Sequence, residues 1–315
     1  MKRIAITGPT GAIGMALIAL CIERKIEVLA ICHKNSKRVK NIPDSPLVKI
    51  VEADLAEYAT LDEKELGACD GLFHLAWNGT TGEARNDMIL QSHNIEYTMD
   101  AVNLAHRLDC GFFIGAGSQA EYGRVEGKLN AQVSANPENG YGMAKLCAGQ
   151  MSRVMCEKLG IRHIWTRILS VYGPYDGEQS MVSSAIRKFG KDEEGAFTEG
   201  RQKWDYLYSK DAAKIMLALG ENGRSGKIYC LGSGNAQELC TYIEKIYDAV
   251  REYQQKPEES IEQREKHLGF GKIPYFDKQV MYLCADIQDL EEDIGKITFT
   301  PFEKGIRETC KINLR

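Results

Sequence analysis

Near its start the chain carries three regularly spaced glycines between an apolar run and a helical pattern. Residues 3–7 are typical of a buried strand, Gly8, Gly11 and Gly14 form a G-x-x-G-x-x-G spacing, and residues 15–23 have helical periodicity. Glycine lets a backbone turn tightly and approach a pyrophosphate closely, and a helix N-terminus offers N–H groups and partial positive charge to an anion. An ordinary turn is the alternative. The order of strand, loop and helix favours a dinucleotide site made by Gly8, Thr10, Gly11, Ala12, Ile13 and Gly14.

More strand-like runs alternate with helical patterns as the chain continues. They lie at residues 28–32, 48–55, 71–77, 112–118 and 161–168, with a long helical pattern at 85–108. Because strands alternating with helices build parallel sheets, we expect an α/β fold with a Rossmann, doubly wound parallel sheet.

Beyond residue 175 the alternation loosens. We expect a strand at 204–208, a helix at 211–219, a strand and glycine turn at 227–234, and a helix at 238–253. No repeat or low-complexity linker separates the two halves. The sequence therefore predicts an NAD(P)-binding Rossmann domain at 1–175 and a smaller C-terminal α/β lobe at 176–315. That lobe is expected to bind mainly substrate, with segments that return to the first domain.

The loop after the second strand bears on the cofactor. An acidic residue there would accept hydrogen bonds from the adenosine ribose, but a basic, hydroxyl-bearing loop follows Cys32. Such a loop suits a 2′-phosphate, so NADP(H) is favoured and NAD(H) is possible, with a solvated loop as the alternative. His74 is interpreted as a structural residue beside the dinucleotide, with a catalytic role as the alternative. Cofactor contacts are predicted at His33, Lys34, Ser36, Arg38, Asp54, Leu55, Leu75, Ala76, Trp77 and Asn94.

Tyr141 and Lys145 lie one helical turn apart on one helix face. A phenol with a pKa near ~10 is a weak acid at neutral pH, and a lysine cation within a few Å lowers that pKa. The pair can therefore move a proton at a carbonyl or alcohol oxygen. Ser118 ends a strand-like run, where ligands bind in open α/β sheets. An exposed helix is the alternative, but the glycine loop and Ser118 favour Tyr141, Lys145 and Ser118 as catalytic residues.

Composition excludes several other functions. A net charge of −4 gives no basic field for nucleic acid or an anionic membrane surface. The ten cysteines form no C-x-x-C pair and no zinc-type cluster with histidine. We therefore expect no bound metal, and we expect the cysteines to be reduced thiols. No apolar run approaches the ~20 residues of a membrane span, and residues 1–3 lead straight into a strand-like run. We expect a cytoplasmic protein without a signal peptide.

Four motifs together resemble one family. They are Thr7-Gly8-x-x-Gly11-x-x-Gly14, Ser118 four residues before Tyr122-Gly123, Tyr141-x-x-x-Lys145, and Arg167-x-x-x-Val171-Tyr172-Gly173-Pro174. Their order and spacing are similar to those of the extended short-chain dehydrogenase/reductases, and more narrowly of the nucleotide-sugar epimerase/dehydratase branch. The resemblance covers nearly the whole chain, since residues 285–286 and 305–309 are also similar to that branch.

This resemblance implies hydride transfer between a nicotinamide and a sugar carbon, usually C4. It implies that Tyr141 is the acid/base, that Lys145 holds the nicotinamide ribose, and that Ser118 hydrogen-bonds the reacting oxygen. Gln119-Ala120 replace the Asp-Glu of the family's 4,6-dehydratases, which disfavours a dehydratase. Trp204 stands where many members have an arginine for the substrate diphosphate. Candidate substrate contacts are thus Ser118, Gln119, Arg187, Arg201 and Trp204, with Lys203 as a further possible cation.

Three functions remain open at this point. The basic loop at 33–38 favours a 4-ketoreductase of an NDP-4-keto-sugar, because NADPH is the usual donor for biosynthetic reduction. An NDP-sugar 4-epimerase that retains NAD is the alternative, and a non-enzymatic NAD(P)-binding sensor or scaffold is a third. The resemblance implies that the partner is a nucleotide-sugar substrate. The resemblance also implies a homodimer built on two paired helices, at about 85–108 and around Tyr141.

Overall fold

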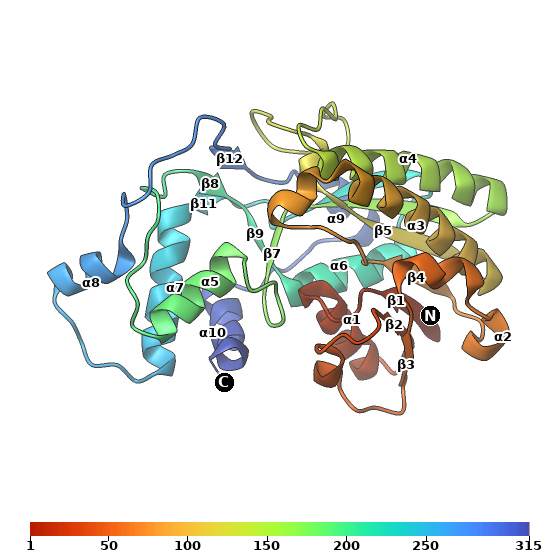
Figure 1. Cartoon of the computed structure of the whole chain (residues 1–315), viewed down its shortest axis with the longest axis horizontal. Coiled ribbons are helices and arrows are strands. Elements are labelled where there is room, and N and C mark those ends of the chain that lie inside the picture. The colour runs from red at the N-terminus through yellow and green to blue at the C-terminus, as the bar shows by residue number, and fades with distance from the viewer. Residues whose placement is uncertain (315) are drawn as a thin grey trace.

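The structure, a computed structural model, describes residues 1–314 and is centred on a seven-stranded sheet (Figure 1). All its neighbouring strands run parallel, in the order β10-β6-β5-β4-β1-β2-β3. The predicted doubly wound, Rossmann-type sheet is confirmed. Its strands are β1 (Arg3–Thr7), β2 (Glu27–Cys32), β3 (Val48–Glu52), β4 (Gly71–His74), β5 (Phe112–Ser118), β6 (Arg162–Ile168) and β10 (Lys227–Leu231).

Helices cover both faces of this sheet, because successive residues of each strand point to opposite sides and both sides are apolar. In β1, Ile4 and Ile6 belong to the core shared with α1 and α6, whereas Ala5 belongs to the core shared with α3 and α4. Figure 1 shows these two helix pairs on opposite faces. The elements of these layers are α1 (Ala12–Glu23), α2 (Glu63–Leu66), α3 (Met88–Arg107), α4 (Gly140–Leu159), α6 (Ser209–Asn222) and α9 (Gln288–Ile294), with the 3-10 turns η1 (Val39–Asn41), η2 (Leu55–Thr60), η3 (Gly82–Asn86) and η4 (Gln119–Glu121).

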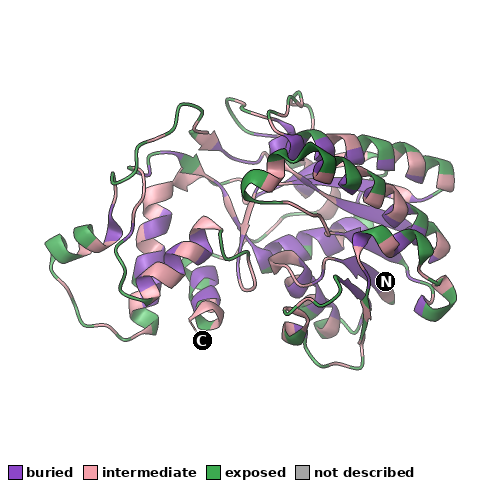
Figure 2. Ribbon diagram, in the orientation of Figure 1, coloured by how far each residue is buried: buried purple, intermediate pink, exposed green. Residues whose placement is uncertain are grey.

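A second group of elements, on the left of Figure 1, has an apolar core of its own. Tyr172, Ile186, Tyr242 and Phe302 lie at its centre, and Figure 2 shows buried residues where its helices meet. Small sheets with the orders β11-β8-β12 and β7-β9 join this core to the first. The elements are β7 (Ser170–Tyr172), α5 (Met181–Gly190), β8 (Lys203–Trp204), β9 (Tyr206–Tyr208), β11 (Gln237–Glu238), α7 (Leu239–Tyr253), α8 (Ile261–Leu268), β12 (Tyr282–Leu283) and α10 (Phe302–Asn313).

Three elements from the later half of the chain, α6, α9 and β10, belong to the large sheet and its helix layers. Helix α6 packs on α1, and β10 pairs in parallel with β6 along the edge of the sheet. This is the kind of return expected for segments beyond residue 175. The assignment of separate cofactor and substrate roles to 1–175 and 176–315 stays a prediction.

The single strand expected at 204–208 is wrong. The segment is divided at Asp205: β8 before it pairs with β11 and β12, and β9 after it pairs with β7. The buried Asp205 carboxylate accepts hydrogen bonds from the backbone N–H groups of Ser233 (2.7 Å), Gly234 (3.0 Å) and Ala285 (3.0 Å). Asp is disfavoured in strands, and here its side chain satisfies backbone donors from two other segments at the point where the strand is interrupted.

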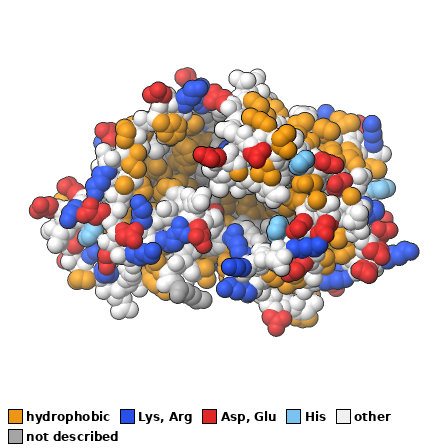
Figure 3. Space-filling model, viewed as in Figure 1, with side chains coloured by type: hydrophobic (Ala, Val, Ile, Leu, Met, Phe, Trp, Pro, Cys, Tyr) orange, Lys and Arg blue, Asp and Glu red, His pale blue; other side chains and the backbone are white. Residues whose placement is uncertain are grey.

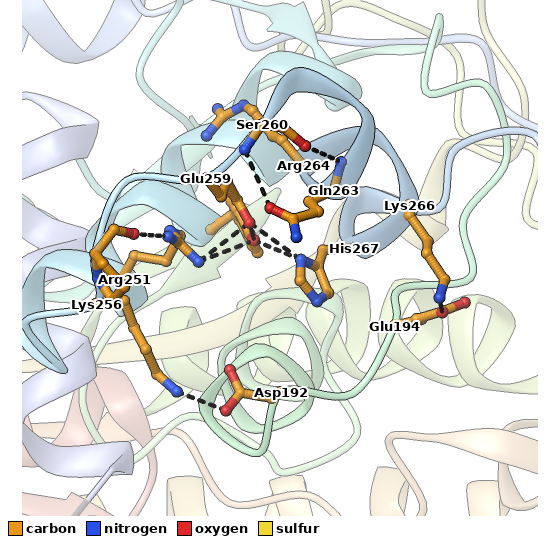
Figure 4. A network of polar contacts seen from close by, with 12 residues as sticks. Asp192, Glu194, Arg251, Lys256, Glu259, Ser260, Gln263, Arg264, Lys266 and His267 are labelled. Atoms are coloured by element: carbon orange, nitrogen blue, oxygen red, sulfur yellow. Dashed lines mark hydrogen bonds and ion pairs between the residues drawn. The ribbon is translucent and has the colours of Figure 1, made fainter.

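The outer end of the smaller lobe is held by ion pairs (Figure 4). The Glu259 carboxylate lies 3.2 Å from Arg251 and 3.2 Å from the His267 imidazole, and so joins α7 to α8. Two further pairs, Lys256–Asp192 and Lys266–Glu194, join this corner to the loop after α5. Residues 256–266 are mostly charged and exposed.

Within residues 1–314, no helix is long and apolar enough to cross a membrane. The same residues contain no group of His, Cys, Asp and Glu side chains that could hold a metal ion. All ten cysteines are free thiols and eight of them are buried. These buried cysteines serve as small core residues.

Candidate active site

A cleft of about 350 Å³ opens at the carboxyl ends of β1, β4 and β5. It brings together residues from five segments that are far apart in the sequence, as the predicted parallel topology requires. The sequence-predicted residues that line it are Gly8, Gly11, Ala12, Ile13, Gly14, Leu75, Trp77, Ser118, Tyr141 and Lys145. Thr80, Ala116, Gly117, Ile168, Leu169, Val171 and Asp176 complete the lining.

The glycine loop forms one wall of this cleft. Gly8 has a φ of +65°, and a Cβ atom there would lie 2.7 Å from the backbone nitrogen of Ala76, so no larger residue fits. A Cβ atom on Gly14 would lie 2.6 Å from the carbonyl oxygen of Pro9. Helix α1 begins after Gly11 without a side-chain cap. Its first N–H groups are thus suited to a pyrophosphate, as the G-x-x-G-x-x-G spacing predicts.

Tyr141 and Lys145 lie on the first turns of α4, both buried. The helix begins because the Asn139 side chain accepts a hydrogen bond from the Gly142 N–H (2.8 Å). The Lys145 Nζ donates to the Ala116 carbonyl (2.5 Å) and lies 3.7 Å from the centroid of the Trp77 ring. The ammonium group is 5.8 Å from the Tyr141 ring, so the two side chains share one face as predicted.

The electrostatics of this pair differ from the sequence expectation. Burial lowers the pKa of Lys145 to about 7, although the Glu121 carboxylate acts to raise it. Burial raises the pKa of Tyr141, while hydrogen bonding by Ser118 and the charge of Arg85 lower it and Glu121 raises it. The cation nearest to the tyrosine ring is Arg85, whose Cζ lies 4.2 Å from the centroid. Sequence reasoning missed Arg85 because nothing in the η3 segment indicates that it folds over α4.

Ser118 is held by a buried ion pair. Its N–H donates to Glu121 Oε1 (2.8 Å), and its hydroxyl accepts from the Ala120 N–H (3.1 Å). Glu121 Oε2 accepts from the Arg167 guanidinium (2.8 Å), and Oε1 also accepts from the Trp165 indole (3.0 Å). Glu121 and Arg167 are 0% and 3% exposed. The sequence motifs contain both residues, but their pairing joins η4 to β6 and is not visible in either motif.

His74 lies beneath the cleft and does not line it. Its Nδ1 is 2.9 Å from the Thr7 hydroxyl, and burial lowers its pKa to about 3, so the imidazole is neutral at physiological pH. This geometry agrees with the interpretation of His74 as a structural residue. Asn94 also makes structural hydrogen bonds. Its side-chain amide accepts from the Asn78 N–H (2.9 Å) and donates to the Asn78 carbonyl (3.0 Å).

The basic loop after β2 lies outside the cleft lining, and three of its basic side chains have partners. His33 is 3.4 Å from the Asp54 carboxylate, and the Lys34 ammonium pairs with Glu57. Arg38 donates to the carbonyl of Tyr175. Two acidic side chains at the start of η2, Asp54 and Glu57, therefore lie beside the loop. The sequence directly after Cys32, which contains no acidic residue, did not indicate them. Other predicted cofactor residues outside the lining are Thr10, Ser36, Leu55 and Ala76.

A second pocket adjoins the cleft and shares Leu169, Val171 and Asp176 with it. Trp204 lines this pocket, and its indole N–H donates to the Ser170 hydroxyl (2.7 Å). In the described chain, no Lys, Arg or His lines it. Of the other predicted substrate residues, Arg187 pairs with Glu178 (3.0 Å), Arg201 is 3.5 Å from Glu238, and none of Arg187, Arg201 and Gln119 lines either pocket.

Comparisons with known proteins agree with this geometry. The model of the NAD dependent epimerase/dehydratase family matches residues 4–232. The chain is 25% identical to an ADP-L-glycero-D-manno-heptose-6-epimerase of Pseudomonas aeruginosa, over 98% of each chain. Two solved structures share the fold. They are a UDP-N-acetylglucosamine 4-epimerase from Methanobrevibacter ruminantium (TM-score 0.83, 22% identity, 98% and 97% covered) and a UDP-glucuronic acid 4-epimerase from Bacillus cereus in complex with NAD (TM-score 0.80, 18% identity, 99% and 98% covered).

The family match covers the glycine loop, the strand that ends at Ser118, and the Tyr141–Lys145 helix, which are the parts that meet in the cleft. The chain therefore belongs to the NAD dependent epimerase/dehydratase family, within the extended short-chain dehydrogenase/reductases.

Proposed function

We propose that this enzyme transfers a hydride at C4 of a nucleotide-activated sugar, as a 4-ketoreductase of an NDP-4-keto-sugar. The observation that carries the proposal is that Tyr141, Lys145 and Ser118 line the same cleft as the glycine loop. The family consists of enzymes, which sets aside a sensor or scaffold, and a pyridine nucleotide fits the glycine loop and the start of α1.

The chain's own residues have distinct tasks in such a reduction. A bound nicotinamide supplies the hydride. The Tyr141 hydroxyl donates its proton to the carbonyl oxygen as the hydride reaches the carbon, and the Ser118 hydroxyl hydrogen-bonds the same oxygen. Lys145 holds the nicotinamide ribose and adds positive charge near the phenolate that remains. Trp204, in the adjoining pocket, is proposed to contact the substrate, with Arg187 and Arg201 as cations for its diphosphate.

An NDP-sugar 4-epimerase that retains NAD is the second candidate, and one observation favours it. The Asp54 carboxylate accepts a hydrogen bond from the Lys34 N–H (3.0 Å) and lies beside His33. An acid at this place suits a free ribose hydroxyl better than a phosphate. Ser36 and Arg38 remain as groups for a 2′-phosphate, and on their account NADP(H) is the proposed cofactor.

Cofactor preference separates the two candidates. We expect the stripped enzyme to bind NADPH about tenfold more tightly than NADH in a fluorescence titration, the equivalent of one hydrogen bond to a charged group. Any nucleotide that co-purifies should first be released and identified. Arg38→Met should weaken NADPH binding and leave NADH binding unchanged. Tightly retained NAD⁺ would instead favour the epimerase and contradict the interpretation of residues 33–38.

The proposal includes a homodimer built on α3 and α4. Figure 3 shows apolar side chains gathered over these helices, and five large ones are exposed there. Monomeric proteins rarely leave such a cluster uncovered. The five exposed side chains are Met88 (56%), Ile89 (69%), Met143 (49%), Met151 (48%) and Val154 (43%).

A cytoplasmic location is a further prediction.

Met151→Glu is expected to convert this dimer to a monomer, because it places a charge in the middle of the apolar face. Sedimentation velocity over a range of concentrations measures the change. Met281→Glu is the matched control, since Met281 is 47% exposed but lies in the smaller lobe. A native chain that sediments as a monomer would contradict the proposed dimer.

A further inference from the structure

The catalytic tyrosine is in contact with a second cation besides the lysine of its own helix. The Arg85 guanidinium lies over the face of the Tyr141 ring, with Cζ 4.2 Å from the centroid, whereas Lys145 Nζ is 5.8 Å away. The negative face of an aromatic ring attracts a cation, and ionisation of the phenol strengthens that attraction. We propose that Arg85 is a positioning residue for Tyr141, which holds the ring in place and makes its hydroxyl a stronger acid.

Arg85 is fixed in this position by the turn that carries it. The guanidinium donates to the Thr80 carbonyl (3.1 Å), and the buried Gln91 amide donates to the carbonyls of Gly79 (2.8 Å) and Ala84 (2.9 Å). These three contacts close the turn between β4 and α3 on itself. The hydrogen bond to Thr80 anchors the guanidinium, and the two Gln91 contacts hold the backbone that carries it.

The same turn is attached to the start of α4. The Asn86 side chain accepts a hydrogen bond from the Gly140 N–H (3.2 Å). A Cβ atom on Gly140 would lie 3.1 Å from the Arg85 carbonyl oxygen and 2.8 Å from the Met88 sulfur. Glycine at position 140 thus allows η3 to pack directly against the residue before Tyr141. Arg85 and Tyr141 are held in one rigid corner.

A guanidinium supplies what Lys145 cannot supply alone. Lys145 lies against Trp77 and the Ala116 carbonyl, and its lowered pKa of about 7 means that its charge is partly lost near neutral pH. An arginine stays protonated throughout this range. Arg85 therefore adds to the tyrosine ring a positive charge that does not depend on the protonation state of the lysine.

The other charged groups around Tyr141 do not provide this charge. The negative charge of Glu121 raises the pKa of Tyr141, but the Glu121 carboxylate is paired with Arg167 (2.8 Å). His74 is neutral. Asp176, on the loop across the cleft, has a pKa raised by burial. Among the described residues, Arg85 is the cation that lies closest to the face of the ring.

Direct titration of Tyr141 tests the proposal. Tyrosine labelled with ¹³C at Cζ gives NMR signals for the side chains of the full-length protein, and the signal missing from Tyr141→Phe is that of Tyr141. In Arg85→Met the titration midpoint is expected to rise by about half a pH unit. Arg85→Lys should restore the native midpoint in large part, because it keeps the charge. The pH profile of kcat should move in the same direction.

The controls separate charge from structure. Arg24→Met removes an equal charge at the end of α1, where Arg24 is 4.0 Å from Glu221 and touches no part of the cleft. It should leave the Tyr141 midpoint unchanged. The role of Arg85 in turnover rests on the proposed function, but the NMR titration needs no substrate. An unchanged midpoint in Arg85→Met, or a failure of Arg85→Lys to restore it, would overturn the proposal even if the enzyme proves to be a reductase.

Discussion

Tyr141→Phe is expected to lower kcat by about 100- to 10,000-fold, the usual contribution of a positioned general acid. The change removes one hydroxyl and keeps the ring, so its contacts with Trp77 and Arg85 remain. No other phenol lines the cleft within the described residues, and Ser118 is too weak an acid to replace it. The measurement is single-turnover oxidation of NADPH with the NDP-4-keto-sugar that the native enzyme reduces.

Two controls make this result specific. The dissociation constant of the cofactor should stay within about twofold of the native value, since a transition-state contact is lost and not a binding contact. Tyr97→Phe, on α3 and outside the cleft, should leave kcat unchanged. If Tyr141→Phe retained native turnover, the acid would be a different group and the assignment of Tyr141 would be wrong.

Glu121→Ala is expected to reduce the free energy of unfolding by about 3–5 kcal/mol, because it leaves the Arg167 guanidinium buried without its carboxylate. The loss includes the hydrogen bonds that Glu121 accepts from the Ser118 N–H and the Trp165 indole. Such a change is a large fraction of the stability of most domains. Urea unfolding followed by circular dichroism measures it.

The control for this prediction is a second variant of the same pair. Replacing both members, Glu121→Ala with Arg167→Met, should recover much of the loss because no unpaired charge stays buried. Glu138→Ala breaks the exposed pair with Arg124 and should leave stability nearly unchanged. Equal decreases in the free energy of unfolding of the single and double variants would contradict this explanation. They would show that lost packing at Glu121, not the unpaired charge of Arg167, causes the destabilisation.

Local patterns in the sequence were sufficient for the fold and for much of the cleft. Three features depend only on neighbours within a few residues, so the local sequence determines their conformation. They are the glycine loop, the strand that ends at Ser118 and the Tyr141–Lys145 spacing. The parallel topology then places their ends at one edge of the sheet. These features required no knowledge of distant contacts.

The features that sequence reasoning missed all depend on partners far along the chain. Lys34 is predicted from the sequence to contact the cofactor, but in the structure Glu57 from another segment pairs with it. The strand at 204–208 is divided because Asp205 satisfies backbone donors near residues 233 and 285. Tertiary contacts of this kind override a local pattern, and only the folded chain reveals them.

The position of β10 has a consequence for synthesis on the ribosome. The sheet is completed only when residues 227–231 pair with β6, yet β6 itself is made about sixty residues earlier (162–168). During that interval the open edge of β6 can pair with the strands of other nascent chains. A fragment that ends near residue 175 would keep this edge permanently, so it should aggregate rather than fold. Chaperone binding during translation is expected to matter most while that stretch is being made.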